Sequence, residues 1–191
     1  MMPSPKKLIQ QERNWLDLPS DVTANILERV GMVDILENAQ KVCTAWRKIC
    51  KDPAMWRVIN MSDIDILRSD AIFSSLTMCK HAVDRSQGQL VDITLVFVYD
   101  PGLLSYIADR SSQLRRLEMA FCFLSKSWTT DALMKFPLLE ELNLYDIEIS
   151  KEEIETVGRY CPMLKTLKVN RNVWRFRAFN FDEGSLASYK R

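Results

Sequence analysis

The residues that could hold a metal or act as nucleophiles are few and widely separated. The five cysteines stand singly, without a CxxC pair, at Cys43, Cys50, Cys79, Cys122 and Cys161. The single histidine, His81, lies within an apolar helical pattern, which favours a structural histidine. The five glycines are scattered and form no phosphate-binding loop. We therefore expect no metal site, no cofactor and no catalytic residues, and reduced thiols in the cytoplasm and/or nucleus.

Charged residues recur in a pattern that suits binding rather than catalysis. The Glu140-Glu141 pair lacks the apolar enclosure that raises a carboxyl pKa for acid–base work. Guanidinium groups bind carboxylates and phosphates, so Arg115 and Arg116 are the best anchors for an acidic or phosphorylated partner. The candidate target-binding set is Arg115, Arg116, Glu118, Glu140, Asn143, Lys165 and Lys168. The alternative interpretation is a solvated face whose oppositely charged rows partly neutralise one another.

These charges belong to a phrase, apolar-x-x-apolar-x-apolar, that recurs along the chain. It begins at Leu90, Leu114, Leu139 and Leu164, at intervals of 24, 25 and 25 residues. Intervals of about 20–29 residues are typical of leucine-rich repeats, in which each phrase forms a strand of a parallel concave sheet. Trp56 to Met61 has the same form and is the expected opening strand, with an enlarged helix after it. Outer helices are predicted over residues 70–84, 101–109, 130–136 and 150–160.

The stretch from Trp15 to Trp56 precedes these repeats and carries apolar residues at helical spacing. Three short helices are predicted, over Asp21–Val30, Asp34–Ala39 and Gln40–Lys51. Ser20 and Asp34 are the expected N-caps, and Gly31 the glycine that ends the first helix. So short a segment buries too little surface to be stable alone, so we expect it to complete its core against another protein.

The same stretch resembles an F-box. It carries Leu18-Pro19, Ile26-Leu27, Val42-Cys43, Trp46, Asp52-Pro53 and Trp56 in the order of that family's pattern. The resemblance implies binding to the Skp adaptor of a cullin–RING ubiquitin ligase. The implied adaptor-binding residues are Leu18, Pro19, Val22, Ile26, Leu27, Val30, Ile35, Leu36, Val42, Cys43 and Trp46. The alternative is that these side chains only pack on one another and on the rest of the chain.

Together the two parts resemble a plant F-box/leucine-rich-repeat protein, an α/β fold with a three-helix F-box followed by a short solenoid. The Cys161-Pro162-Met163-Leu164 phrase strengthens the likeness to cysteine-containing repeats. The expected domains are a flexible tail at 1–13, the F-box at 14–56, repeats at 57–172, and a C-terminal cap or truncated repeat at 173–191.

The resemblance implies a non-catalytic substrate-recognition subunit of a Skp–cullin–F-box ligase, with an unknown protein as its target. The alternative is an adaptor-bound scaffold without a degradative role. A net charge of +1 gives no reason to expect nucleic acid, although the arginines and aromatics of 173–191 leave that alternative open. No apolar run reaches the roughly 18 residues of a membrane helix, so we expect no membrane partner.

Overall fold

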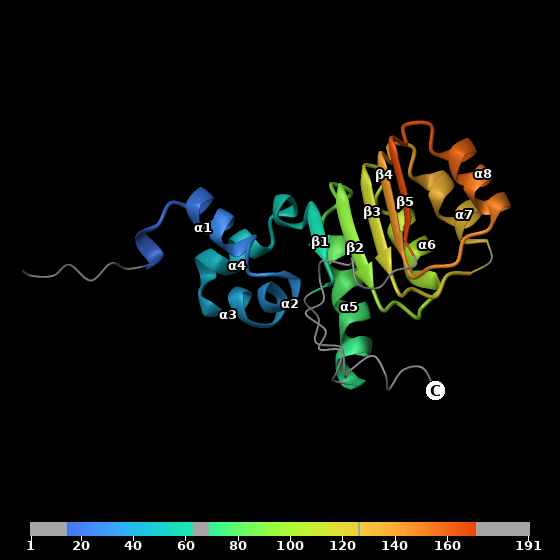
Figure 1. Ribbon diagram of the computed structural model, residues 1–191. Helices are drawn as coiled ribbons and strands as arrows, with labels where there is room; N and C mark the ends of the chain where they lie inside the picture. Colours follow the sequence, from blue (N-terminus) through green and yellow to red (C-terminus); the bar gives the residue numbers. More distant parts are fainter. Residues whose placement is uncertain (1–14, 63–68, 126, 171–191) are drawn as a thin grey trace, which may run out of the picture.

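The computed structural model describes residues 15–62, 69–125 and 127–170. A group of short helices at one end is followed by a parallel sheet with helices on one side of it (Figure 1). The predicted α/β class, with an N-terminal helical module before a repeat solenoid, is confirmed. The predicted tail at 1–13 and the whole of the predicted cap at 173–191 lie outside the described residues.

The first helix starts as a proline-led turn rather than with a serine cap. A 3-10 turn, η1 (Trp15–Asp17), leads into α1 (Ser20–Leu27). Pro19 is the N-cap: its carbonyl accepts both the Thr23 amide at 3.0 Å and the Thr23 hydroxyl at 3.1 Å. The prediction of Ser20 as N-cap is therefore wrong. The regular helix also ends three residues before Val30, because the Arg29 and Val30 amides bond three residues back and tighten the last turn.

The next two helices begin at other residues than those predicted, and the boundary between them also differs. One continuous helical segment comprises α2 (Met32–Asp34), a π-helical turn η2 (Ile35–Ala39) and α3 (Gln40–Val42). Gly31, with φ of 91°, is its N-cap, so Asp34 lies inside the helix and does not cap it. Cys43 is extended and separates this segment from α4 (Thr44–Cys50), so the single helix predicted over Gln40–Lys51 is divided.

The N-cap of α4 is Cys43, whose sulfur accepts the Trp46 amide at 3.4 Å. Beyond α4, the predicted stop at Asp52-Pro53 is confirmed. There the Asp52 carboxylate accepts the Ala54 amide at 3.0 Å and caps η3 (Pro53–Trp56). Three helical segments thus form the N-terminal module, as predicted.

The sheet contains five parallel strands in sequence order. They are β1 (Val58–Asn60), β2 (Asp92–Val96), β3 (Arg116–Ala120), β4 (Glu141–Tyr145) and β5 (Thr166–Asn170). The register pairs Ile59, Ile93, Leu117, Leu142 and Leu167, the fourth residue of each predicted phrase. The repeat phrase therefore sets the register, and the predicted opening strand at Trp56–Met61 is confirmed.

The helices on one side of the sheet supply the other half of each repeat (Figure 1). They are α5 (Ser69–Arg85), α6 (Gly102–Ala108), α7 (Trp128–Asp131) with the 3-10 turn η4 (Leu133–Lys135), and α8 (Lys151–Tyr160). The capping box predicted at α8 is confirmed: Ser150 accepts the Glu153 amide at 3.1 Å and donates its own amide to the Glu153 carboxylate at 2.8 Å. The helix predicted over 130–136 is divided into α7 and η4.

The core lies between the sheet and these helices. In the repeats of β2, β3 and β4 the three apolar positions of each phrase are at most 1% exposed: Leu90, Ile93, Leu95, Leu114, Leu117, Met119, Leu139, Leu142 and Leu144. In the last repeat Leu164 and Leu167 are only half-buried, and Val169 is 43% exposed. Burial in a stacked array comes from neighbouring repeats, so the inner repeats carry most of the stability.

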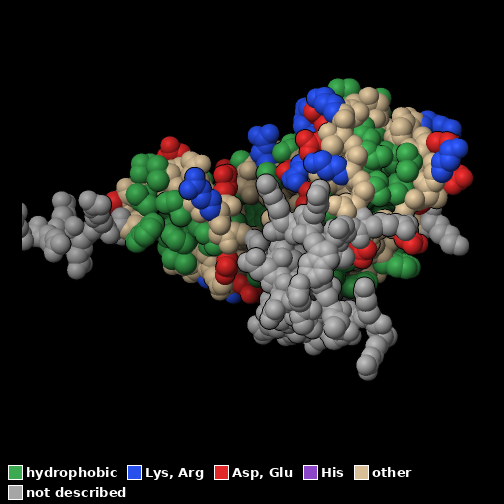
Figure 2. Space-filling model, in the orientation of Figure 1, with side chains coloured by type: hydrophobic (Ala, Val, Ile, Leu, Met, Phe, Trp, Pro, Cys, Tyr) green, Lys and Arg blue, Asp and Glu red, His purple; other side chains and the backbone are tan. Residues whose placement is uncertain are grey.

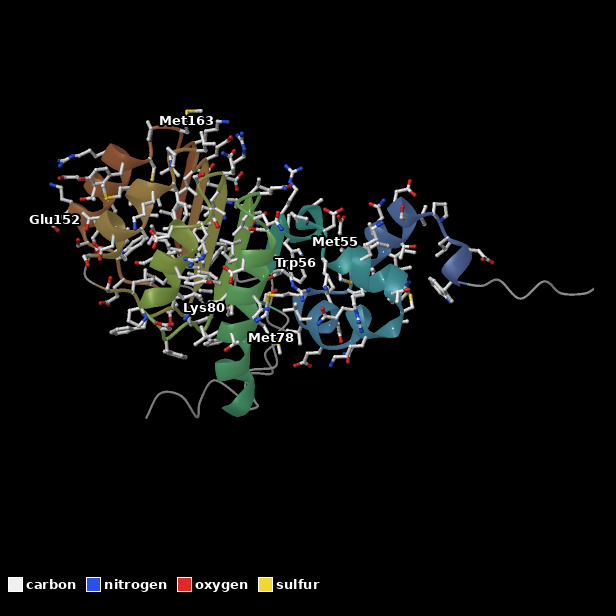
Figure 3. All side chains as sticks on the ribbon, turned by 180° about the vertical axis from the view of Figure 1, so that it is seen from behind. Met55, Trp56, Met78, Lys80, Glu152 and Met163 are labelled. Atoms are coloured by element: carbon white, nitrogen blue, oxygen red, sulfur yellow. The ribbon has the colours of Figure 1, made fainter. Side chains whose placement is uncertain are left out.

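The helical module is joined to the first repeat by buried apolar and polar contacts. Trp56 is 1% exposed and donates its indole N–H to the Cys50 carbonyl at 2.9 Å. Arg85 of α5 lies 5.4 Å from the Trp56 ring and donates to Gln40 at 3.0 Å. Figure 3 shows Met55 and Trp56 at this junction. The two halves therefore share a core rather than meeting through a bare linker.

Candidate docking surfaces

The N-terminal module carries an apolar stripe that nothing in the described chain covers. Val22 and Ile26 of α1 are 39% and 36% exposed, and Val30 in the following turn is 41% exposed. The spacing of four residues places them one above another on one face of the helix. Figure 2 shows hydrophobic side chains gathered over this module. Neighbouring exposed apolar residues of this kind mark interaction sites more often than isolated ones do.

The eleven predicted adaptor-binding residues divide into three groups by exposure. Pro19, Val22, Ile26, Val30 and Val42 are exposed, Leu18, Cys43 and Trp46 are half-buried, and Leu27, Ile35 and Leu36 are buried. Leu27 is 0% exposed and belongs to the core. The three buried residues lie beneath the exposed ones, and which of the eleven contact a partner stays a prediction.

Trp15 is an exposed aromatic that the predicted contact set lacks. It is 63% exposed in η1, where its carbonyl accepts the Leu18 amide at 3.4 Å. That turn leads into the start of α1. Trp15 gave no periodic signal in the sequence, because it lies in a three-residue 3-10 turn ahead of α1.

The second candidate surface is the sheet face opposite the helices, where the predicted charged rows lie. Asp92, Arg116 and Glu141 stand side by side on β2, β3 and β4, as do Thr94, Glu118 and Asn143. Lys168 continues the latter row on β5. Four of the predicted target-binding residues, Arg116, Glu118, Asn143 and Lys168, therefore lie on neighbouring strands of one sheet.

These charges are largely engaged with one another. Arg116 bonds to Asp92 at 3.0 Å and to Glu118 at 2.5 Å, and lies 3.6 Å from Glu141. Glu118 in turn accepts the side-chain amide of Asn143 at 3.2 Å. Partial burial alone would lower the pKa of Arg116, but the neighbouring carboxylates outweigh it and raise that pKa. Arg116 therefore links neighbouring repeats, and a partner would have to displace these carboxylates to bind it.

Glu140 has a similar role at the start of the strands. Its carboxylate pairs with Arg115 and accepts from Lys165 at 2.5 Å. Hydrogen bonds from Lys165 and Arg115 lower the pKa of Glu140 below its usual value. The predicted neutralisation between rows is thus seen, and an acidic partner would have to compete for Arg115 and Arg116 with the protein's own carboxylates.

The residues with reactive side chains form no common site in the described part of the chain. All five cysteines are free thiols. Burial raises the pKa of Cys79 to about 12 and the pKa of Cys122 and Cys161 to about 11. His81 is exposed on α5, whereas its neighbours Cys79 and Ala82 are buried, so the imidazole lies outside the apolar face of this helix. Within the described ranges no three histidine, cysteine or acidic side chains converge to hold a metal.

The described helices include none that is long and apolar enough to cross a bilayer. A three-helix module joined to a parallel solenoid defines the class: a leucine-rich-repeat protein with an N-terminal helical module. Residues 15–62 match the F-box-like family, and residues 89–190 match the repeats described as FBD-associated F-box protein At5g56370, LRR repeats.

Relatives in Arabidopsis thaliana match most of the chain. The chain is 46% identical over 165 residues to F-box protein SKIP19, covering 86% of this chain and 54% of that protein. It is 47% identical over 162 residues to putative F-box/LRR-repeat protein 23, covering 83% of this chain and 35% of the relative. It is 45% identical over 163 residues to putative F-box/LRR-repeat protein 9, covering 83% of this chain and 66% of that protein. The chain belongs to the F-box/leucine-rich-repeat family and spans about half the length of these relatives.

Proposed function

We propose that this chain is a non-catalytic substrate-recognition subunit of a Skp–cullin–F-box ubiquitin ligase. The observation that carries the proposal is the uncovered apolar stripe of Val22, Ile26 and Val30 on an F-box-like module. The stripe, with the exposed Pro19 and Val42 and the half-buried Leu18, Cys43 and Trp46, is the proposed adaptor surface. F-box proteins in general dock the Skp adaptor through this module, and their typical role is recognition rather than catalysis.

The mechanism is proximity. The helical module holds the adaptor, the repeats hold a target protein, and ubiquitin transfer takes place on other subunits of the ligase. The receptor contributes effective concentration and orientation, which the shared core around Trp56 favours because it limits motion between the two halves. The cytoplasm and/or nucleus, where cullin–RING ligases act, is the proposed location.

Thiol labelling offers a footprint of the proposed adaptor surface. Thiolate is the reactive form, so burial and raised pKa should protect Cys50, Cys79, Cys122 and Cys161 from N-ethylmaleimide at pH 7.5. Cys43 is half-buried, as Cys122 is, but burial raises the pKa of the Cys122 thiol to about 11, so Cys43 should react first. Adding a purified Skp-type adaptor should slow the labelling of Cys43, measured by mass spectrometry of peptides. Unchanged Cys43 labelling in a verified complex would remove Cys43 from the interface.

A proteome comparison separates a receptor from an adaptor-bound scaffold. Loss of a receptor lets its target accumulate, whereas loss of a scaffold leaves protein half-lives unchanged. We expect a small set of proteins to rise in cells lacking the chain, and the same set to rise in wild-type cells treated with a proteasome inhibitor. Re-expression of a variant with a charged stripe, Val22→Asp with Ile26→Asp, should not restore degradation. Absence of any accumulating protein would favour the scaffold.

A further inference from the structure

The outer edge of β1 is an open strand edge. In the described residues β1 pairs with β2 alone and ends the sheet on the side of the helical module. The Arg57 carbonyl accepts the Asp92 amide at 3.2 Å, and the Met61 amide donates to the Thr94 carbonyl at 3.0 Å. Alternate residues of a strand direct their backbone groups to the same neighbour, so residues 57, 59 and 61 face β2. Val58 and Asn60 therefore direct their backbone N–H and C=O groups to the open side.

A cavity lies beside this open edge. Its volume is about 590 Å³, and Val58 and Asn60 form part of its wall. Its apolar wall comes from Met32 and Ile35 of the helical module and from Met55 and Trp56 at the junction, all nearly buried. The space is large enough for a leucine- or phenylalanine-sized side chain together with part of a backbone.

The charges at this cavity are not neutralised as they are on the rest of the sheet. Arg29 and Arg57 line it, are exposed, and have no ion-pair partner among the described residues. By contrast, Arg116 of β3 and Arg115 just before that strand each bond to carboxylates of the chain itself. Glu28 is the one carboxylate in the lining, so the cavity has an excess of one positive charge. It therefore complements a partner that carries acidic side chains.

We propose that the outer edge of β1 and this cavity bind an extended peptide segment of the target. The segment adds a strand beside Val58–Asn60, places one large apolar side chain against Met32, Ile35 and Trp56, and places acidic side chains near Arg29 and Arg57. Backbone hydrogen bonds supply affinity in this mode of recognition, and the pocket and charges supply selectivity. The inference rests on the proposed function, since it locates target binding at the junction of the two halves.

The test uses the full chain and a displayed library of random twelve-residue peptides as the probe. We expect enrichment of peptides that combine a large apolar residue with acidic neighbours and lack proline at the centre. Synthetic versions of the enriched peptides are then titrated by fluorescence polarisation. A version with N-methyl groups on alternate central residues loses its strand-pairing donors and should bind about tenfold more weakly.

Two variants with matched controls test the same mode from the side of the protein. Asn60→Pro removes an outward N–H but no β1–β2 hydrogen bond, and it follows an extended strand residue, so it should fold and weaken binding about tenfold, whereas Asn60→Ala should bind as wild type. Thermal unfolding verifies the fold of both. Arg29→Glu with Arg57→Glu should reverse the charge preference of the peptides, and Arg159→Glu on α8 is the control.

Absence of any enriched peptide, or equal binding by wild type, the Asn60→Pro variant and the doubly charge-reversed variant, would overturn the inference. Adaptor capture is measured in parallel on the same preparations. Capture without peptide selection overturns only the β1-edge site. Peptide binding without capture contradicts the proposed ligase role and leaves the binding site in place.

Discussion

Ile26→Asp should abolish capture of a Skp-type adaptor while leaving the fold intact. Ile26 is at the centre of the apolar stripe and is 36% exposed, so the charge lies in solvent when the chain is free. In a complex the carboxylate would be buried against apolar groups without a partner, which is strongly unfavourable. Central interface residues contribute about 2 kcal/mol or more, so affinity should fall at least about 30-fold. A pull-down with purified adaptor measures the loss.

Two neighbours on α1 serve as controls for this result. Asn25→Asp adds the same charge at the next exposed position on the helix, outside the stripe, and should retain capture. Leu27→Ala, at a fully buried position, should lower the free energy of unfolding by about 2–5 kcal/mol through a cavity in the core. Full capture by the Ile26→Asp variant would mean that the stripe is not the docking surface.

Leu142→Ala should destabilise the repeats strongly, and the equivalent change one repeat later should not. Leu142 of β4 is 0% exposed and packs between two covered repeats, so its truncation should cost about 2–5 kcal/mol. Leu167 occupies the same position in β5 but is only half-buried, so Leu167→Ala should cost distinctly less. Urea unfolding monitored by circular dichroism measures both free energies.

The comparison of these two leucines tests the repeat architecture itself. A solenoid predicts different costs because burial at each phrase position depends on the next repeat, not on the residue type. Equal losses for the two variants would show that residue 167 is covered as fully as residue 142. Hydrogen exchange of β4 and β5 amides in the wild-type protein would then locate the covering segment.

The repeats could be predicted from sequence because their signal is local and recurrent. Each phrase places three apolar side chains on one face of a strand, and the interval between phrases fixes which residues pair. Ile93, Leu117 and Leu142 accordingly lie in register. The capping box of Ser150 and Glu153 could also be predicted, because both of its residues lie within one helical turn.

The helix boundaries of the N-terminal module could not be predicted in the same way. Ser20 and Asp34 were expected as N-caps, but Pro19 and the extended Cys43 are the N-caps of α1 and α4. Gly31, expected to end the first helix, is the N-cap of the second helical segment. These choices depend on how α1, α2 and α4 pack against one another, which a capping rule for an isolated helix does not include. The separation of Ile26 from buried Leu27 depends on the same packing, since both are apolar residues of one helix.

The charged surface shows a second limit of sequence reasoning. Arg116 and Asp92 are 24 residues apart, and only the stacking of repeats brings them to 3.0 Å. The sequence suggested Arg116 as an anchor for a partner, whereas in the fold it links two repeats. No sequence pattern marked Arg29 and Arg57 as binding residues. In the fold they are exposed beside an apolar cavity and lack ion-pair partners in the described chain.

Titration of a purified Skp-type adaptor into the full chain, followed by calorimetry, tests the central claim most directly. An F-box-like module with an uncovered apolar stripe predicts a one-to-one complex with a Kd of about 1 μM or tighter and a negative heat-capacity change from apolar burial. The Ile26→Asp variant should give no heat of binding under the same conditions. Absence of a complex between the adaptor and a correctly folded wild-type chain would contradict the assignment to a ubiquitin ligase.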